Sequence, residues 1–290
     1  MAAFSASIES GDKATITLIG NSFSQNSSTL MTLVTNAFSS YEKMIVSNRL
    51  EQTGTDPNLL QPFVIEQKEI SEDDVGSNLL AMLVPLMLVL AIGVGAAPSS
   101  YDLFAGEKEK KTMEALLMTP VNRSTLLLSK WLSITSIGVL TGMITLLVVI
   151  VEIAFFTENL KSGLSFGENI WMIVLLSLLV IIVFSMFNAA LLMLTSIVAK
   201  TVKEAQSYST PIMMLTVFPT MIISSIGVNE FAFYHFAIPI MNIFSILKEL
   251  LFGVINYEHI LITLLSNLAA VIIIFILSRI LILKDKWVMS

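Results

Sequence analysis

Five stretches of the chain are apolar and long enough to cross a lipid bilayer as helices. A spanning helix needs about 20 residues, each of which adds about 1.5 Å of length, and each stretch holds a run of that length without Asp, Glu, Lys or Arg. A helix buried in a water-soluble core would be shorter and would carry a polar stripe, which these runs lack. The predicted spans are residues 79–98, 131–156, 170–198, 208–227 and 259–282.

Before the first span, residues 1–78 have the pattern of a small α/β domain. Residues 14–19 are rich in residues that favour β-strands and show strand-like alternation. Residues 63–70 form a second run of this kind, so both are predicted strands. Between them, apolar residues recur three and four positions apart over 28–52, which predicts an amphipathic helix that ends at Gly54. We interpret this domain as one that packs on itself or on the same domain of a partner, with substrate binding as the alternative.

Composition favours a membrane protein and excludes several other classes. Of the 290 residues, 55% are hydrophobic and 13% are charged, and the mean hydropathy is +0.82. There is no cysteine, which excludes disulfides and thiolate metal sites. The net charge of −6 lies in residues 1–78, and no part of the chain has a basic face for nucleic acid. We predict a mainly α-helical, multi-pass protein of the cell membrane, in contact with lipid.

Basic residues in the short loops predict the orientation of the spans. Ten lie on one side of the predicted membrane and two, Lys161 and Lys248, lie on the other. The more basic side is expected to be cytoplasmic, so the C-terminal tail 283–290 is placed inside the cell. Residues 1–78 and the segment 228–258, a predicted loop with short helices, are placed outside. The first 28 residues have no export signal. We therefore expect a preceding transmembrane helix that this sequence lacks, or translocation of the domain by the first span.

A charged stretch, residues 99–130, connects the first two predicted spans on the cytoplasmic side. In a helix, Glu107 would face Lys110 and Lys111, and Lys110 would face Glu114. One interpretation is a solvated loop that carries the positive charge of the inner side. The other is a short amphipathic helix on the inner membrane face, with a charged edge that a cytoplasmic protein can bind.

The string GEKEKKTMEALLMTPVNRSTLLLSK, residues 106–130, resembles the signature of exporter-type (type-2) ABC permeases, in particular the NatB-like sodium-efflux group. The resemblance implies a transmembrane subunit with six spans, so the sequence would lack the family's first span. In the family this stretch is the coupling region that rests on a separate ATPase. The residues that match, and that would transmit closure of the ATPase to the helices, are Gly106, Glu107, Lys108, Glu109, Lys111, Glu114, Thr119, Pro120 and Arg123.

Nucleotide binding is expected on a partner subunit. The chain has no G-x-x-x-x-G-K-[ST] phosphate-binding loop, so ATP and Mg²⁺ are assigned to the cytoplasmic ABC ATPase. We predict that the permease itself is not an enzyme and binds no cofactor or metal directly. A second permease copy, identical or related, is the other expected partner.

Polar groups at membrane depth are costly and therefore mark candidate positions in an ion pathway. Glu152 and Asn188 are the two candidates, with an interfacial carboxylate and an interhelical hydrogen bond as the simpler interpretations. Gly138 and Gly142 form a G-x-x-x-G pattern, which predicts close helix packing within the subunit or at a dimer interface.

The sequence thus predicts the permease of an ATP-driven exporter that works by alternating access. Efflux of Na⁺ is implied by the family resemblance alone. Export of hydrophobic drugs, peptides or lipids is the alternative among exporters, and a non-transporting sensor or scaffold is the alternative of another class. An intramembrane enzyme is disfavoured because the sequence has no catalytic constellation.

Overall fold

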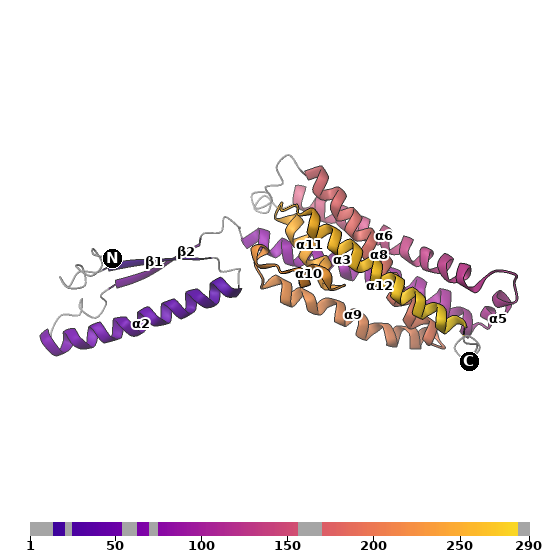
Figure 1. Ribbon diagram of the computed structural model, residues 1–290, viewed down its shortest axis with the longest axis horizontal. Coiled ribbons are helices and arrows are strands. Elements are labelled where there is room, and N and C mark those ends of the chain that lie inside the picture. Colours follow the sequence, from indigo (N-terminus) through magenta and orange to yellow (C-terminus); the bar gives the residue numbers. More distant parts are fainter. Residues whose placement is uncertain (1–13, 21–24, 54–62, 70–74, 156–169, 284–290) are drawn as a thin grey trace. The chain divides into compact units, whose positions relative to one another are not determined.

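The computed structural model describes residues 14–20, 25–53, 63–69, 75–155 and 170–283 (Figure 1). It divides into two compact units, one of residues 1–73 with 225–230 and one of residues 74–224 with 231–290. The expected C-terminal tail lies outside the described residues, apart from Leu283.

The first unit contains a parallel β-α-β arrangement. Strand β1 (Ala14–Gly20) pairs with β2 (Phe63–Glu69), with Ala14 opposite Phe63 and Gly20 opposite Glu69. Parallel strands need a long crossover, and helix α2 (Gln25–Thr53) supplies it. Gly20 allows close approach of α2, since a Cβ there would lie 2.3 Å from Met31 Sδ. The sequence predicts strands over 14–19 and 63–70 and a helix over 28–52 in this part of the chain.

One side of α2 presents apolar side chains to solvent. Leu30 is 61% exposed, Leu33 is 59% exposed and Met44 is 55% exposed. The half-buried positions instead include Met31, which lies against β1. The stripe that contains Leu30 and Leu33 is therefore not the face that α2 buries in this unit.

Long helices form the second unit. These are α3 (Val75–Tyr101), α6 (Arg123–Phe155), α8 (Ile170–Val198), α9 (Val202–Ser224) and α12 (Tyr257–Leu283). Helix α3 contacts α6, α8 and α9, so it is the central helix of the bundle (Figure 1). Its core side chains include Leu88 and Ile92, both 0% exposed. The short helices α10 (Phe233–Ala237) and α11 (Met241–Leu251) pack together, α10 also against α12 and α11 against α3.

Four of the described helices are long and apolar enough to cross a membrane. Their bounds are Leu80–Glu109, Arg123–Glu152, Trp171–Val198 and Tyr257–Leu283. The predicted span 208–227 falls mainly in α9, which is not among these four helices and contains two internal prolines, Pro211 and Pro219. The multi-pass α-helical class is supported, and the fifth span stays a prediction.

The connection between the first two spans is shorter than the sequence predicts. Helix α3 continues into the π-helical turn η2 (Asp102–Gly106) and the short helix α4 (Glu107–Glu109), and α6 already begins at Arg123. The expected boundary at residue 131 came from treating Lys130 as a loop residue, whereas Lys130 is inside α6 and only 6% exposed. A buried ion pair, described below, makes that position possible.

The two glycines of the G-x-x-x-G pattern pack inside the subunit. A Cβ on Gly142 would lie 2.7 Å from Ile181 Cγ2 of α8 and 3.0 Å from Ile92 Cγ1 of α3. A Cβ on Gly138 would lie 3.4 Å from Ser185 Cβ. Of the two predicted alternatives, close packing within the subunit is the one that the structure has.

Candidate coupling site

The segment between α3 and α6 is bent rather than a single helix. Helix α4 ends at Glu109, Lys111 has a left-handed backbone with φ of 57°, and α5 runs from Thr112 to Leu117. The predicted pairing of Glu107 with Lys110 and Lys111 is not what the structure has, because the helix is interrupted at Lys111 and the carboxylate of Glu107 pairs with Lys130. The side chain of Glu114 lies outside the described residues.

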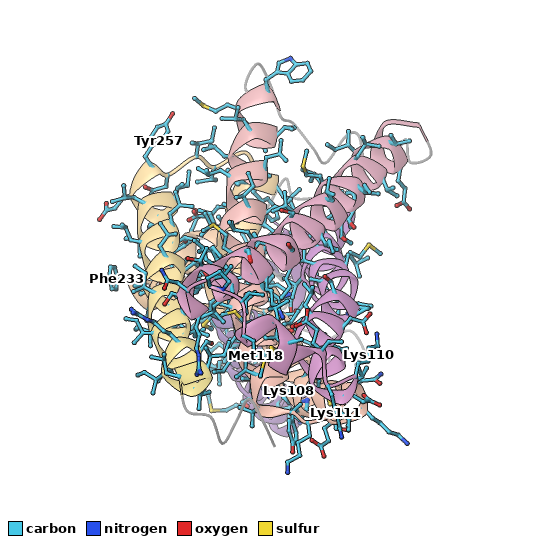
Figure 2. All side chains as sticks on the ribbon, turned by 90° about the vertical axis from the view of Figure 1, so that its right-hand side faces the viewer. Lys108, Lys110, Lys111, Met118, Phe233 and Tyr257 are labelled. Carbon is cyan, nitrogen blue, oxygen red and sulfur yellow. The ribbon has the colours of Figure 1, made fainter. Side chains whose placement is uncertain are left out.

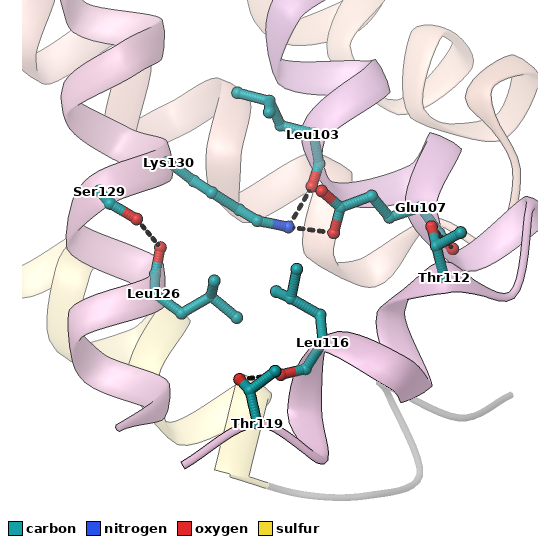
Figure 3. Close-up of polar contacts among 8 residues, drawn as sticks. All are labelled: Leu103, Glu107, Thr112, Leu116, Thr119, Leu126, Ser129 and Lys130. Atoms are coloured by element: carbon teal, nitrogen blue, oxygen red, sulfur yellow. Dashed lines mark hydrogen bonds and ion pairs between the residues drawn. The ribbon is translucent and has the colours of Figure 1, made fainter. Parts of the chain in front are cut away.

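Glu107 pairs instead with a lysine of the next long helix. The ammonium of Lys130 donates to Glu107 Oε2 and, at 2.5 Å, to the carbonyl of Leu103 (Figure 3). Lys130 Nζ also lies 5.0 Å from the centre of the Phe104 ring, within the range of a cation–π contact. These contacts connect α4 and η2 to α6. The side chains of Glu107 and Lys130 are both partly removed from water.

The next two charged residues bind the turn between α8 and α9. Lys108 Nζ donates to the carbonyls of Ile197 and, at 3.1 Å, Ala199, at the C-terminal end of α8. Glu109 Oε2 accepts at 3.0 Å from the N–H of Val202, the first residue of α9. Each side chain has the opposite sign to the partial charge of the helix end that it contacts, so the interaction is stabilising.

Arg123 makes the same kind of contact with the last helix. Its Nη1 donates at 3.1 Å to the carbonyl of Ile282 and at 3.5 Å to that of Leu283, at the C-terminal end of α12. Through Glu107, Lys108, Glu109 and Arg123, a segment of fewer than twenty residues binds α6 and the ends of α8, α9 and α12.

Other side chains of the same segment point to solvent, and we call Lys110, Lys111, Met118 and Val121 the exposed tip. Met118 is 88% exposed and Val121 is 53% exposed. Figure 2 looks onto this end of the unit, where Lys110, Lys111 and Met118 are at the surface.

The turn that carries Met118 is ordered by Thr119 and Pro120. The Thr119 hydroxyl donates at 2.6 Å to the carbonyl of Leu116 (Figure 3), and Pro120 follows in the exposed turn. Gly106 is buried at the other end of the segment, where a Cβ would lie 3.4 Å from Asp102 Oδ1 and 3.5 Å from Val202 Cγ2. Of the predicted coupling residues, Lys111, Thr119 and Pro120 are exposed, Gly106 is buried, and Glu107, Lys108 and Arg123 are half-buried against the bundle. Glu109 is exposed but accepts from the N–H of Val202 at the start of α9.

The two candidate pathway residues have different surroundings. Glu152 is exposed on α6, beside Val148 and Val151. Asn188 is 5% exposed in α8, and its Nδ2 has no hydrogen-bond partner among the described residues. A Cβ on Gly93 would lie 3.8 Å from that nitrogen. Asn188 is thus a buried side chain whose amide nitrogen has no partner among the described residues, and Glu152 is a surface carboxylate.

Sequence reasoning missed two buried charges in α11. Lys248 is 3% exposed and donates at 3.1 Å to the carbonyl of Ile223 and at 3.4 Å to that of Ser224, at the C-terminal end of α9. Glu249 is 2% exposed and faces His259 of α12. The pattern of basic residues assigns Lys248 to an outer loop, because a short run between spans gives no sign that it folds back into the bundle. In the part of the chain that the structure describes, three or more His, Asp or Glu side chains do not gather as they would around a metal ion.

Comparison with known proteins agrees with this architecture. The family model described as "ABC-2 family transporter protein" matches residues 8–286. The chain is 38% identical over 275 residues to the ABC transporter permease protein NatB of Bacillus subtilis (strain 168), a match that covers 94% of this chain and 71% of the relative. No solved structure matches significantly. The chain therefore belongs to the ABC-2 transporter family and is a transmembrane permease subunit that works with a separate ATPase.

Proposed function

We propose that this permease exports Na⁺ and that its ATPase binds the exposed tip formed by Lys110, Lys111, Met118 and Val121. One observation carries the proposal: the segment that ends in this tip also binds the ends of α8, α9 and α12 and a buried lysine of α6. A protein that moves the tip would displace four helices at once. Two basic and two apolar side chains also suit an acidic groove with an apolar floor on the partner.

Two copies of the permease would form the transport pathway between them. Binding of ATP would close the two partner ATPases, bring the two tips together and shift the attached helices, which opens the pathway outward. Such a change is a shift between two arrangements, driven by the difference in the partner's affinity for each. ATP and Mg²⁺ would be held by the partner.

Sodium as the substrate is supported by the resemblance of residues 106–130 to sodium-efflux permeases, and the match to NatB over most of the chain agrees with that resemblance. The described residues offer hard oxygen ligands in a largely apolar bundle, which suits a hard cation. Transport in inverted vesicles that contain the partner ATPase decides this point. ATP-dependent uptake of Na⁺ supports the proposal, whereas uptake of a hydrophobic dye without Na⁺ uptake identifies an exporter of apolar compounds.

Docking is tested by reversing charge at the tip. Because Lys110 and Lys111 are exposed and Glu107 is paired internally, Lys110→Glu with Lys111→Glu is the informative variant. We expect the affinity for the ATPase to fall at least about tenfold, equivalent to about 1.4 kcal/mol, with the permease still folded. Arg279→Glu, an exposed basic residue of α12, is the matched control for a general charge effect.

Coupling is tested separately from docking. Arg123→Gln removes the bond to the end of α12 but leaves the tip unchanged, so the ATPase should still bind while ATP-dependent transport falls. If the double reversal at Lys110 and Lys111 leaves binding and transport at wild-type levels, the tip is not the docking surface.

A further inference from the structure

Helix α11 is almost completely buried although it is not apolar. Asn242 and Ser245 are 0% exposed, Lys248 is 3% exposed and Glu249 is 2% exposed. The charge of Lys248 is accounted for by the carbonyls at the end of α9 and by the Phe231 ring, whose centre is 5.9 Å from Nζ. Asn242 and Glu249 contact α12 and need a different explanation.

Glu249 is only partly satisfied. Its Oε1 is 2.8 Å from Nδ1 of His259, and the His259 ring stacks on Phe236 with ring centres 3.9 Å apart. Oε2 has no hydrogen-bond partner among the described residues. A buried carboxylate oxygen without a partner is costly, commonly by about 1–3 kcal/mol or more.

Buried polar atoms without hydrogen-bond partners also occur along α12. Thr263 and Asn267 follow His259 at intervals of four residues, so they lie on one face at steps of about 6 Å. The amide of Asn267 donates at 3.1 Å to Asn242 Oδ1 of α11 and at 2.9 Å to the carbonyl of Thr263. Thr263 Oγ1, Asn267 Oδ1 and Asn242 Nδ2 are left without partners in the described part of the chain.

We propose that the seam between α11 and α12, formed by Asn242, Glu249, His259, Thr263 and Asn267, binds one Na⁺ ion. This inference rests on the proposed function and locates its substrate within the permease. Three of the four unsatisfied atoms are oxygens, which are the ligands of hard cations. The single carboxylate matches a single positive charge, so the seam suits a monovalent ion better than a divalent one.

Few charged groups surround the Glu249 carboxylate. Burial raises the pKa of the Glu249 carboxyl, and the hydrogen bond from His259 opposes that rise. His259 is the titratable group that faces Glu249 from α12, whereas His235 of α10 accepts at 2.8 Å from the N–H of Ala232. Helices α3 and α8 contain no Asp, Glu, Lys or Arg, and Lys203 and Glu204 lie at the far end of α9.

The test measures equilibrium binding of radioactive Na⁺ to the purified full chain in detergent at pH 8, with K⁺ and choline as competitors. Glu249→Gln should weaken binding at least tenfold, and Thr263→Val should weaken it severalfold. The matched controls are Glu258→Gln, an exposed carboxylate at the start of α12, and Thr220→Val, whose buried hydroxyl on α9 also has no partner among the described residues. Both controls should bind as the wild type does.

Each result decides the question. Saturable binding that Glu249→Gln and Thr263→Val weaken supports the site, whereas absence of saturable binding, or equal binding by all variants, means that the seam holds only water. If Glu249→Gln does not fold, Thr263→Val still decides, because its hydroxyl makes no bond to the protein that folding would lose. ATP-dependent Na⁺ transport that persists in both variants overturns the site but not the permease function. Failure of the wild type to transport Na⁺ with its ATPase overturns the proposed function itself.

Discussion

Lys130 shows how single charges set the arrangement of this bundle. A lysine that is 6% exposed is tolerable only if its ammonium is paired, and it has a carboxylate, a carbonyl and an aromatic ring around it. Removing one partner of a buried pair costs more than replacing both with apolar groups. The losses of stability caused by substituting Glu107 and Lys130 singly are therefore expected not to add up in the double variant.

Lys130→Met should lower the free energy of unfolding by about 3 kcal/mol, because Glu107 would remain charged and unpaired. Adding Glu107→Gln to that variant should restore part of the loss. Thermal denaturation in detergent measures both, with Lys110→Met as an exposed control that should change stability little. Equal losses in the single and double variants would show that the pair is not the cause.

The charged residues of the segment between α3 and α6 could be singled out from the sequence, but their contacts could not be predicted. The resemblance selected Lys108, Glu109 and Arg123, yet it did not indicate that they bind helix ends. The acceptors and donors are backbone groups of Ala199, Val202 and Ile282, which lie about 90 to 160 positions away in the sequence. Spacing rules describe neighbours on one helix, so they cannot identify such partners.

At the scale of elements, the helices were predictable because apolar length is a strong signal, whereas their ends were not. The start of α6 at Arg123 precedes the predicted boundary by a full two turns, since Lys130 has a partner that the local sequence does not reveal. The prediction for 228–258 included short helices, and the structure has α10 and α11 there. It did not include the burial of α11, because that depends on long-range contacts with α3 and α9.

Close packing of α3, α6 and α8 gives a prediction with an internal control. Gly142→Ala places a Cβ 2.7 Å from Ile181 Cγ2 and should destabilise the protein by about 1–3 kcal/mol through overpacking. Gly138→Ala makes its nearest contact at 3.4 Å and should change stability much less. The two melting temperatures, measured side by side, test the packing directly. Equal shifts for both alanines would contradict it.

At the scale of the whole molecule, the orientation in the membrane rests on the distribution of basic residues. The chain contains no cysteine, so single cysteines can be introduced into the native sequence without other changes. Positions that are exposed near opposite ends of the long helices are Met118, at 88%, and Trp171, at 81%. They are suitable reporters because substitution removes little packing.

In intact cells, a membrane-impermeant maleimide should label Trp171→Cys and spare Met118→Cys. The reason is that Met118 belongs to the predicted cytoplasmic side and Trp171 to the other. Permeabilised cells, in which both positions should react, are the control. Labelling of Met118→Cys alone in intact cells would reverse the assigned orientation.

The π-helical turn at Asp102–Gly106 has a consequence for the phase of the chain. A π turn contains an extra residue relative to an α-helix, and each residue of an α-helix advances the chain by about 100°. Loss of one residue there would let α3 continue in regular α-helical phase and would rotate Lys108 and Glu109 by about that angle. Both charges would then turn away from the ends of α8 and α9. The number of residues in this turn, and not only their identity, therefore determines whether movement of the segment reaches the rest of the bundle.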